Sequence, residues 1–580
     1  MGERLVTAHE RLRNACTHAW RIGILCSLLV FGLLAFALAM PPHPEKFKEH
    51  RLAGEPLPYF LQHRIEFLEG QQQALARTAG VQTAEYSGQF RTLAILIRFT
   101  DRNNLVAPED FDNLLFVNQQ GSLRHYYREN SYGQFDVVSA NLPSSLGWIT
   151  APQTYDYYCN NSNGTGSYPQ NTQRLCEDVV SAVNPLVDFS QYDNNGDGYV
   201  DGLILIHTGR GAEFTQLDSD IWSHMWATPT PVSVDGVQVW KYNIQPEYWI
   251  SPGDMTCGVY CHEFGHILGL PDLYDTDWPS DSYGIGNWSI MSYGSWCGPS
   301  GMGGSPAHFD AWSRIQLGFA TPVNVANSMT GVSIASVESG GTIYRLWSDG
   351  ASGNEYYLIE NRQRTGYDSY LSSDGLLIWH IDENQSDNDN EWYPGHTSTG
   401  HYRVALEQAD GLFELEKKLS VGDAGDPFPG NINNTSFTPT TVPNTMAYSG
   451  ENTGAAVTNI SSSAPVMTMD FQVSLVSGEE EEMVDLVPAH IELGQNYPNP
   501  FNPRTRIDFN LPKPACARLE IYDILGRPVR TMLDGRFLSG TISIEWDGCD
   551  QDGNRLPSGI YLYKLQTASE TATKKMMLVK

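Results

Sequence analysis

The chain has 580 residues, with 36 lysines and arginines against 67 aspartates and glutamates, so its formal net charge is −31. This acidic balance excludes a protein that binds nucleic acid through a basic surface. Hydrophobic residues make up 41% of the chain and aromatic residues 11%, which suffices for packed cores and excludes a chain that is disordered throughout.

The N-terminal segment has the organisation of a secretory signal. An uncharged run, Ile22 to Ala39, follows an arginine-containing stretch and ends in Ala37-Leu38-Ala39. A basic region, an apolar run and a small-x-small end predict a signal peptide over residues 1–39. The mature protein is then secreted or held at the cell surface, and it meets a membrane only through this segment during export. The run is also long enough to stay as an uncleaved anchor, and this alternative remains open.

Residues 40–88 are polar and mixed in charge. They precede a strongly apolar stretch, Thr92 to Phe99, which predicts a buried strand. A segment between a signal and a folded core is typical of a pro-peptide, so we predict a pro-peptide at 40–88 and a zymogen. The alternative is an N-terminal extension of the fold.

The rest of the chain divides by pattern. From 89 to 325 predicted strands and helices mix, and from 326 to 475 the pattern is that of strands only. A run of four consecutive glutamates predicts an acidic, solvated linker at 476–489. From 490 to 580 short predicted strands alternate with Pro, Gly and Asn turns, which indicates a small β-sandwich.

One helical stretch carries a metal-binding pattern. His262 and His266 are four residues apart, which puts both imidazoles on one face of a helix as neighbouring metal ligands. Glu263 is rotated off that pair, so its carboxylate can act as general base on a metal-activated water without being a ligand itself. Gly269 allows a sharp turn after the second histidine, and Asp272 can then return as third ligand. The pattern HExxHxxGxxD is the metzincin arrangement with Asp as the third ligand, and it predicts zinc.

A methionine and a tyrosine follow about twenty residues downstream. Met291 in a tight turn under the metal corresponds to the Met-turn of the metzincins, so we assign it a structural role; the alternative is an ordinary core methionine. Tyr293 can bind the metal at rest and hydrogen-bond the developing oxyanion, so we predict that it is catalytic together with Glu263.

A second metal pattern lies at 193–201. The oxygen ligands that it offers follow the first part of an EF-hand loop, with a glycine at the sixth position: Asp193, Asn195, Asp197, the Tyr199 carbonyl and Asp201. The twelfth position is an isoleucine, so the bidentate glutamate is missing. We predict a short calcium loop leading into a strand. The alternative is a metal-free turn of Asp, Asn and Gly.

Seven cysteines follow the signal segment, counted as the nine of the chain less Cys16 and Cys26. An odd number in an oxidising compartment suggests disulfides and one free thiol. By proximity we expect Cys159 to pair with Cys176, Cys257 with Cys297 and Cys516 with Cys549.

From about 90 to 475 the chain resembles the immune-inhibitor-A-like secreted metalloproteases, the M6 peptidase family of the metzincin clan. The stretches that carry the resemblance are Gly121 to Gly133, Asp220 to His224, the zinc helix with Leu270 to Asp275, Gly286 to Met291, Glu360 to Gln363 and Gly375 to His380. The resemblance implies endopeptidase activity on proteins or peptides. It also implies that His262, His266 and Asp272 hold zinc and that Glu263 is the base.

The last segment resembles the C-terminal sorting domain of type IX secretion cargo, which is similar to the Ig-like domain of the flagellar hook-capping protein. The matching stretches are Asn496 to Pro503, Ile521 to Arg527, Trp546 to Gly548 and the closing Lys574 to Lys580. The resemblance implies the type IX secretion machinery as a partner. The alternative is an ordinary accessory β-sandwich.

These inferences combine into an α+β architecture: a metzincin-type catalytic domain at 89–325, an all-β domain at 326–475 and a C-terminal Ig-like β-sandwich at 490–580. The function expected is that of a secreted zinc endopeptidase, stabilised by calcium. An inactive adhesin or binding protein on the same scaffold is the alternative, and a protease assay with and without a zinc chelator separates the two.

Overall fold

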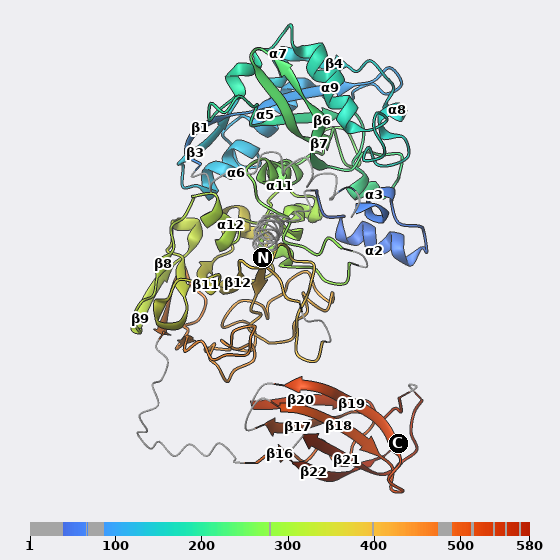
Figure 1. The fold of residues 1–580 in the computed structure, drawn as a ribbon, viewed down its shortest axis with the longest axis vertical. Coiled ribbons are helices and arrows are strands. Elements are labelled where there is room, and N and C mark those ends of the chain that lie inside the picture. Colours follow the sequence, from blue (N-terminus) through green and yellow to red (C-terminus); the bar gives the residue numbers. More distant parts are fainter. Residues whose placement is uncertain are drawn as a thin grey trace, which may run out of the picture.

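The computed structural model describes residues 39–64, 67, 86–277, 280–396, 400–473, 490–511, 515–537, 540–551, 554–567 and 570–579. The predicted signal segment up to residue 38, much of the predicted pro-peptide and the predicted acidic linker lie outside these ranges. The described chain contains both helices and sheets, which confirms a mixed α+β protein (Figure 1). No helix in the described ranges has the length and apolarity needed to cross a membrane.

A five-stranded sheet forms the first layer of the structure, in the order β4-β2-β5-β7-β6. Four of its strands run parallel, and β6 pairs antiparallel to β7 at one edge. The predicted buried strand at 92–99 is confirmed as β2. The strands are β2 (Leu93–Arg98), β4 (Trp148–Thr150), β5 (Leu203–His207), β6 (His224–Val234) and β7 (Val237–Pro246). A separate parallel pair joins β1 (Gly88–Arg91) to β3 (Phe135–Val138).

Helices cover both faces of this sheet (Figure 1). On one face, α9 (Thr172–Val183) begins at Asn171, whose side chain accepts hydrogen bonds from the first-turn amides, and its apolar side joins a core that also contains residues of β2, β5 and β6. On the other face lies α11 (Cys257–Ile267), which is apolar nearly all round and buried from Cys257 to His266. The remaining helices are α2 (Pro44–Leu52), α3 (Tyr59–Gln62), α5 (Pro108–Leu115), α6 (Leu123–Asn130), α7 (Pro143–Leu146), α8 (Tyr155–Cys159), α10 (Ala212–Thr215) and α12 (Ala311–Gln316).

The β-rich part contains two sheets, in the orders β13-β12-β11-β10-β8 and β14-β15-β9. Their strands are β8 (Val323–Asn324), β9 (Met329–Ala335), β10 (Tyr344–Leu346), β11 (Glu355–Arg362), β12 (Gly375–Asp382), β13 (Val404–Leu406), β14 (Ala456–Thr458) and β15 (Val466–Gln472). Along β12, Leu377 and Trp379 pack into the core that contains α11, whereas Leu376 and Ile378 pack toward the second sheet. Because β12 is buried on both faces, one continuous core crosses residue 325, where we expected a domain boundary.

The C-terminal unit is a β-sandwich, as the sequence predicts. Its sheets have the orders β16-β17-β20 and β19-β18-β21-β22, and they enclose a core of their own that includes Trp546 and Tyr563. The strands are β16 (Glu492–Leu493), β17 (Thr505–Leu511), β18 (Ala515–Tyr522), β19 (Pro528–Phe537), β20 (Gly540–Trp546), β21 (Gly559–Thr567) and β22 (Thr571–Leu578).

The predicted disulfides are wrong. Each expected pair contains a cysteine that is a free thiol: Cys159, Cys176, Cys257, Cys297 and Cys549. All of these except Cys549 are buried in packed cores, and burial raises the pKa of the Cys159 thiol to about 12. Proximity along the chain says little about the separation and direction of the two Cβ atoms, on which a disulfide depends.

Candidate active site

Helix α11 presents two histidines on one face, as their spacing predicts. The Nε2 atoms of His262 and His266 face each other at 3.2 Å. The other ring nitrogen of each histidine is occupied: Nδ1 of His262 lies 2.7 Å from the Ile290 carbonyl, and Nδ1 of His266 lies 2.8 Å from the Leu270 carbonyl. A carbonyl can only accept, so each Nδ1 carries the proton and each Nε2 is left as a lone-pair donor for a metal.

Asp272 completes the set, because the chain turns back after the helix. Gly269 takes a φ of 95°, a left-handed conformation that suits glycine, and Leu270 N–H donates to the Gly265 carbonyl at 3.1 Å. Oδ1 of Asp272 then lies 3.1 Å from Nε2 of His262 and 3.4 Å from Nε2 of His266. These three atoms could hold a metal ion.

The separations fit zinc. Ligands about 2.0–2.1 Å from a tetrahedral zinc lie roughly 3.3–3.4 Å from one another, close to the three distances here. Two buried oxygens also lack any hydrogen-bond partner among the described residues: Oδ1 of Asp272, which belongs to this set, and Oε2 of Glu263, which is next to it. Unpartnered buried carboxylate oxygens are costly, and a cation at the focus of the three ligands would offset that cost.

Glu263 is fully buried beside the ligands without joining them. Burial raises the pKa of its carboxyl well above the ordinary value, and the nearby carboxylates of Asp272 and Glu213 raise it further. A base with a raised pKa can accept a proton and return it. A divalent cation at the ligand set would lower this pKa again, since it favours the charged form.

Met291, the residue of the predicted Met-turn, packs against α11. Its peptide carbonyl accepts from Leu273 N–H at 2.8 Å, and its side chain approaches Gly265 so closely that a Cβ at Gly265 would come within 2.6 Å of the sulfur. The preceding residue, Ile290, orients His262 through its carbonyl. The turn therefore supports the helix and fixes one ligand ring.

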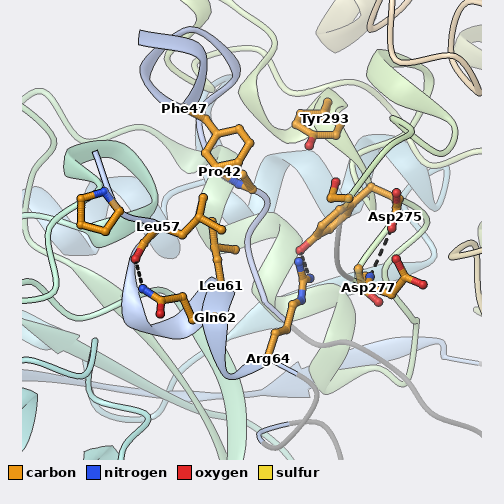
Figure 2. A pocket seen from close by; sticks show the side chains of 13 residues that line it. Pro42, Phe47, Leu57, Leu61, Gln62, Arg64, Asp275, Asp277 and Tyr293 are labelled. Carbon is orange, nitrogen blue, oxygen red and sulfur yellow. Dashed lines mark hydrogen bonds between the residues drawn. The ribbon is translucent and has the colours of Figure 1, made fainter. Parts of the chain in front are cut away.

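Two tyrosines compete for the role that the sequence assigns to Tyr293. The Tyr293 ring packs edge-on against Tyr274, with centroids 5.7 Å apart, and lines a cavity of about 530 Å³. In Figure 2 it faces that cavity together with Phe47 and Leu61. The Tyr274 hydroxyl instead donates, at 2.6 Å, to the carbonyl of Ala39, which lies at the ligand set. Nothing in the sequence pattern had singled out Tyr274.

The feature that sequence reasoning missed most completely is that Ala39 and Met40 enter this site. The Ala39 carbonyl oxygen lies 3.3 Å from Nε2 of His262, and Ala39 N–H donates to Oδ2 of Asp272 at 3.1 Å. Met40 N–H donates to Oε1 of Glu263 at 2.7 Å. Ala39 also forms an antiparallel bridge with His224 at the start of edge strand β6.

The rest of this N-terminal segment covers the site. It continues into α2 and α3, and their side chains form one wall of the 530 Å³ cavity (Figure 2). Arg64 reaches inward: its guanidinium donates to the Tyr274 hydroxyl, packs over that ring and lies 3.7 Å from Oδ2 of Asp272. A buried cation from this segment thus faces the ligand carboxylate.

The expected calcium residues lie together in an exposed loop. Asp193 Oδ1 accepts from the amides of Gly196 and Asp197, and the Asn195 amide nitrogen lies 3.3 Å from Asp197 Oδ2 and 3.2 Å from Asp201 Oδ1. Burial raises the pKa of Asp201 to about 6, and Asp197 and Asp193 contribute. Tyr199 bridges Gln238 at the start of β7, which joins the loop to the sheet.

Two parts of the chain match models of known protein families. Residues 103–319 match the model of the immune inhibitor A peptidase M6 catalytic domain. That stretch contains His262, Glu263, His266, Asp272 and Met291. Residues 501–571 match the FlgD Ig-like domain.

Two curated relatives align with part of the chain. Immune inhibitor A of Bacillus thuringiensis subsp. alesti is 31% identical in an alignment of 287 positions that covers 41% of this chain and 41% of the relative. The pre-pro-metalloprotease PrtV of Vibrio cholerae serotype O1 (strain M66-2) is 33% identical in an alignment of 278 positions that covers 39% of this chain and 30% of the relative. The chain therefore spans less than half of the length of either relative. A solved structure of FLGD from P. aeruginosa is 29% identical and covers 13% of this chain and 58% of that one, with a TM-score of 0.11.

Proposed function

We propose that the protein is a secreted zinc endopeptidase that hydrolyses peptide bonds of proteins. His262, His266 and Asp272 hold the zinc, and Glu263 is the general base. The observation that carries the proposal is the close approach of three possible ligand atoms, of which Asp272 Oδ1 lacks a hydrogen-bond partner, beside a buried carboxylate outside that set. The M6 match over 103–319 and the metalloprotease relative support it.

The chemistry follows from the positions of the groups. Zinc, when bound, polarises the scissile carbonyl and lowers the pKa of water toward about 7. Glu263 takes a proton from the attacking water and passes it to the leaving nitrogen. Met40 N–H points at Glu263 Oε1, so a peptide nitrogen placed there is within reach of that proton. The Tyr274 hydroxyl can hydrogen-bond the carbonyl as it becomes negative.

The test of this function is hydrolysis of casein by the purified secreted protein, with elemental analysis of the same sample. We expect zinc near one equivalent, loss of activity with a zinc chelator and recovery when zinc is added back. Activity that persists after the zinc has been removed would overturn the proposal. Stoichiometric zinc in a protein that cleaves nothing, even after limited proteolysis, would favour the inactive adhesin.

We propose further that residues 40–88 are a pro-peptide and that the full chain is a zymogen. The contact of Met40, the first residue of this segment, with Glu263 supports this, because a chain in that position excludes a substrate. Arg64 supports it as well, because it faces Asp272 from the same segment.

Loosening this segment should raise the activity of the full chain. Arg64→Ala removes the hydrogen bond to Tyr274 and the ion pair with Asp272, and a buried charge-assisted contact contributes about 1.5–3 kcal/mol. We expect basal casein hydrolysis to rise roughly tenfold or more. Arg51→Ala, which changes an exposed arginine of the same segment, is the matched control. Equal basal activity in the two variants would argue against a restraining role for Arg64.

We propose calcium binding at 193–201, on the strength of its ligand pattern. Calcium at about one hundred times its Kd contributes about 2.7 kcal/mol, so the Tm should rise by roughly 3 °C. Asp193→Asn should abolish that rise at constant zinc, whereas Glu451→Gln, at an exposed carboxylate elsewhere, should retain it. If calcium does not change the Tm of the parent protein, the loop is a metal-free turn.

For the C-terminal unit we propose a sorting role in type IX secretion, with the mature protein released or held at the cell surface. The FlgD Ig-like match over 501–571 supports the sandwich, and the resemblance of its opening and closing motifs supports the role. Deleting residues 490–580 should leave the protein inside a type IX-competent host, which immunoblotting of cell fractions would reveal.

A further inference from the structure

The N-terminal segment lies in the site in the direction of a substrate. The carbonyl of Ala39 lies at the ligand set, and the nitrogen of the same peptide unit, Met40 N, faces Glu263. The Ala39–Met40 unit therefore marks the place of the bond to be cleaved. Residues 40–43 then occupy the positions of the first four residues after that bond.

Two tryptophans hold the main chain of this segment. The indole N–H of Trp222 donates to the Met40 carbonyl at 2.9 Å, and the indole N–H of Trp296 donates to the Pro41 carbonyl at 3.0 Å. The next main-chain hydrogen bond comes from His43 N–H, which donates to the Glu213 carbonyl at 2.8 Å.

The positions in between are prolines, Pro41 and Pro42, which have no N–H to offer. A peptide that adds a strand to a sheet edge needs N–H groups along its length. Here the Met40 and Pro41 carbonyls accept from the two indoles, and the N–H groups of the segment that donate to main-chain carbonyls belong to Met40 and His43 on either side, so proline costs no hydrogen bond at positions 41 and 42. Proline also limits the freedom that a free peptide loses on binding.

Of the four positions after the bond, the first holds an apolar side chain and the fourth a ring. Met40 is 1% exposed and belongs to the same core cluster as Phe214 and Trp296. The His43 ring lies between these two side chains, with centroids 5.2 Å from Phe214 and 4.7 Å from Trp296.

We propose that the cleft takes extended peptides with an apolar residue after the cleaved bond, proline at the second and third positions and a ring at the fourth. Trp222 and Trp296 position the main chain of such a substrate. This inference rests on the proposed peptidase function for the identity of the ligand. The contacts themselves can be tested without any catalysis.

The first test is hydrogen exchange in the full chain, followed by mass spectrometry of peptides that cover residues 40–52. Trp222→Phe and Trp296→Phe keep a ring and lose one hydrogen bond each, so exchange of the His43 amide should become about fivefold faster. Trp249→Phe is the matched control, because the Trp249 indole N–H is buried without a hydrogen-bond partner among the described residues. Unchanged exchange in the first two variants, or an equal change in the third, would overturn the proposal that Trp222 and Trp296 position the main chain.

The double variant Pro41→Ala/Pro42→Ala tests the proline positions. It introduces two amides into the segment, and we expect both to exchange as freely as in an unfolded peptide. Protection of either new amide would show that the cleft pairs with N–H groups there, which would overturn the inference about proline. This outcome does not depend on whether Trp222→Phe folds.

The second test compares two fluorogenic peptides with the secreted protein after limited proteolysis. One contains Ala-Met-Pro-Pro-His and the other Ala-Met-Ala-Ala-His. We expect kcat/KM for the first to equal or exceed that for the second, with a product that begins at Met. A value more than tenfold lower for the proline peptide would overturn the substrate class. Failure to cleave either peptide or casein would count against the peptidase function instead. The exchange results would still decide whether Trp222 and Trp296 hold the main chain of the segment.

Discussion

Replacing Glu263 by glutamine is expected to reduce peptide hydrolysis by about 10⁴-fold while zinc remains bound. The side chain is buried beside the ligand set and contributes no atom to it, so its loss should leave the three ligands in place. Glutamine keeps the shape and can still accept from a peptide N–H, but it cannot take a proton from water. The measurement is kcat on a peptide substrate together with the zinc content of each preparation.

Glu213→Gln is the matched control for this prediction. Glu213 is also fully buried near Glu263, but its carboxylate accepts from the hydroxyl and the amide of Ser223. We expect that variant to keep activity within about tenfold of the parent. Unreduced turnover in Glu263→Gln would remove the assigned base, and loss of zinc from it would make Glu263 a ligand.

Tyr274→Phe is expected to lower kcat about a hundredfold with little change in KM. The reason is the position of its hydroxyl, 2.6 Å from a carbonyl oxygen that lies at the ligand set. A donor at that place stabilises the transition state more than the ground state, because negative charge grows on the oxygen during attack. A fall in kcat with an unchanged KM distinguishes this role from a general loss of packing.

Tyr293→Phe should have the smaller effect, within about threefold, because the Tyr293 side chain faces the cavity between the N-terminal segment and residues 274–277. If Tyr293→Phe lowered kcat more than Tyr274→Phe, the catalytic role would belong to Tyr293. That result would also imply that Tyr293 turns toward the ligand set once the N-terminal segment has left.

The residues that could be predicted from sequence are those whose positions depend on local geometry. His262 and His266 are placed by one helical turn, and Asp272 by a glycine turn next to the same helix. The partners that come from far away in the chain could not be predicted. Ala39 lies 223 residues from His262 in sequence, and no spacing rule connects them.

For the same reason, the sequence could not show which of Tyr274 and Tyr293 has its hydroxyl at the carbonyl oxygen. Tyr274 and Tyr293 both lie close to the ligands along the chain, but which hydroxyl reaches the carbonyl depends on how the turn at Met291 packs under α11. The wrong disulfide pairs also depended on directions that sequence proximity does not contain. By contrast, β2 and β12 were recognisable from their uninterrupted apolar runs.

Strand β12 has a practical consequence for shortened forms of this protein. Leu377 and Trp379 pack into the same core as α11, the helix that carries His262 and His266. A fragment that stops at residue 325 would leave the underside of that helix facing water. The minimal active unit should therefore extend to about residue 473, and protease engineers who trim at the end of the M6-like match should expect aggregation instead of an enzyme.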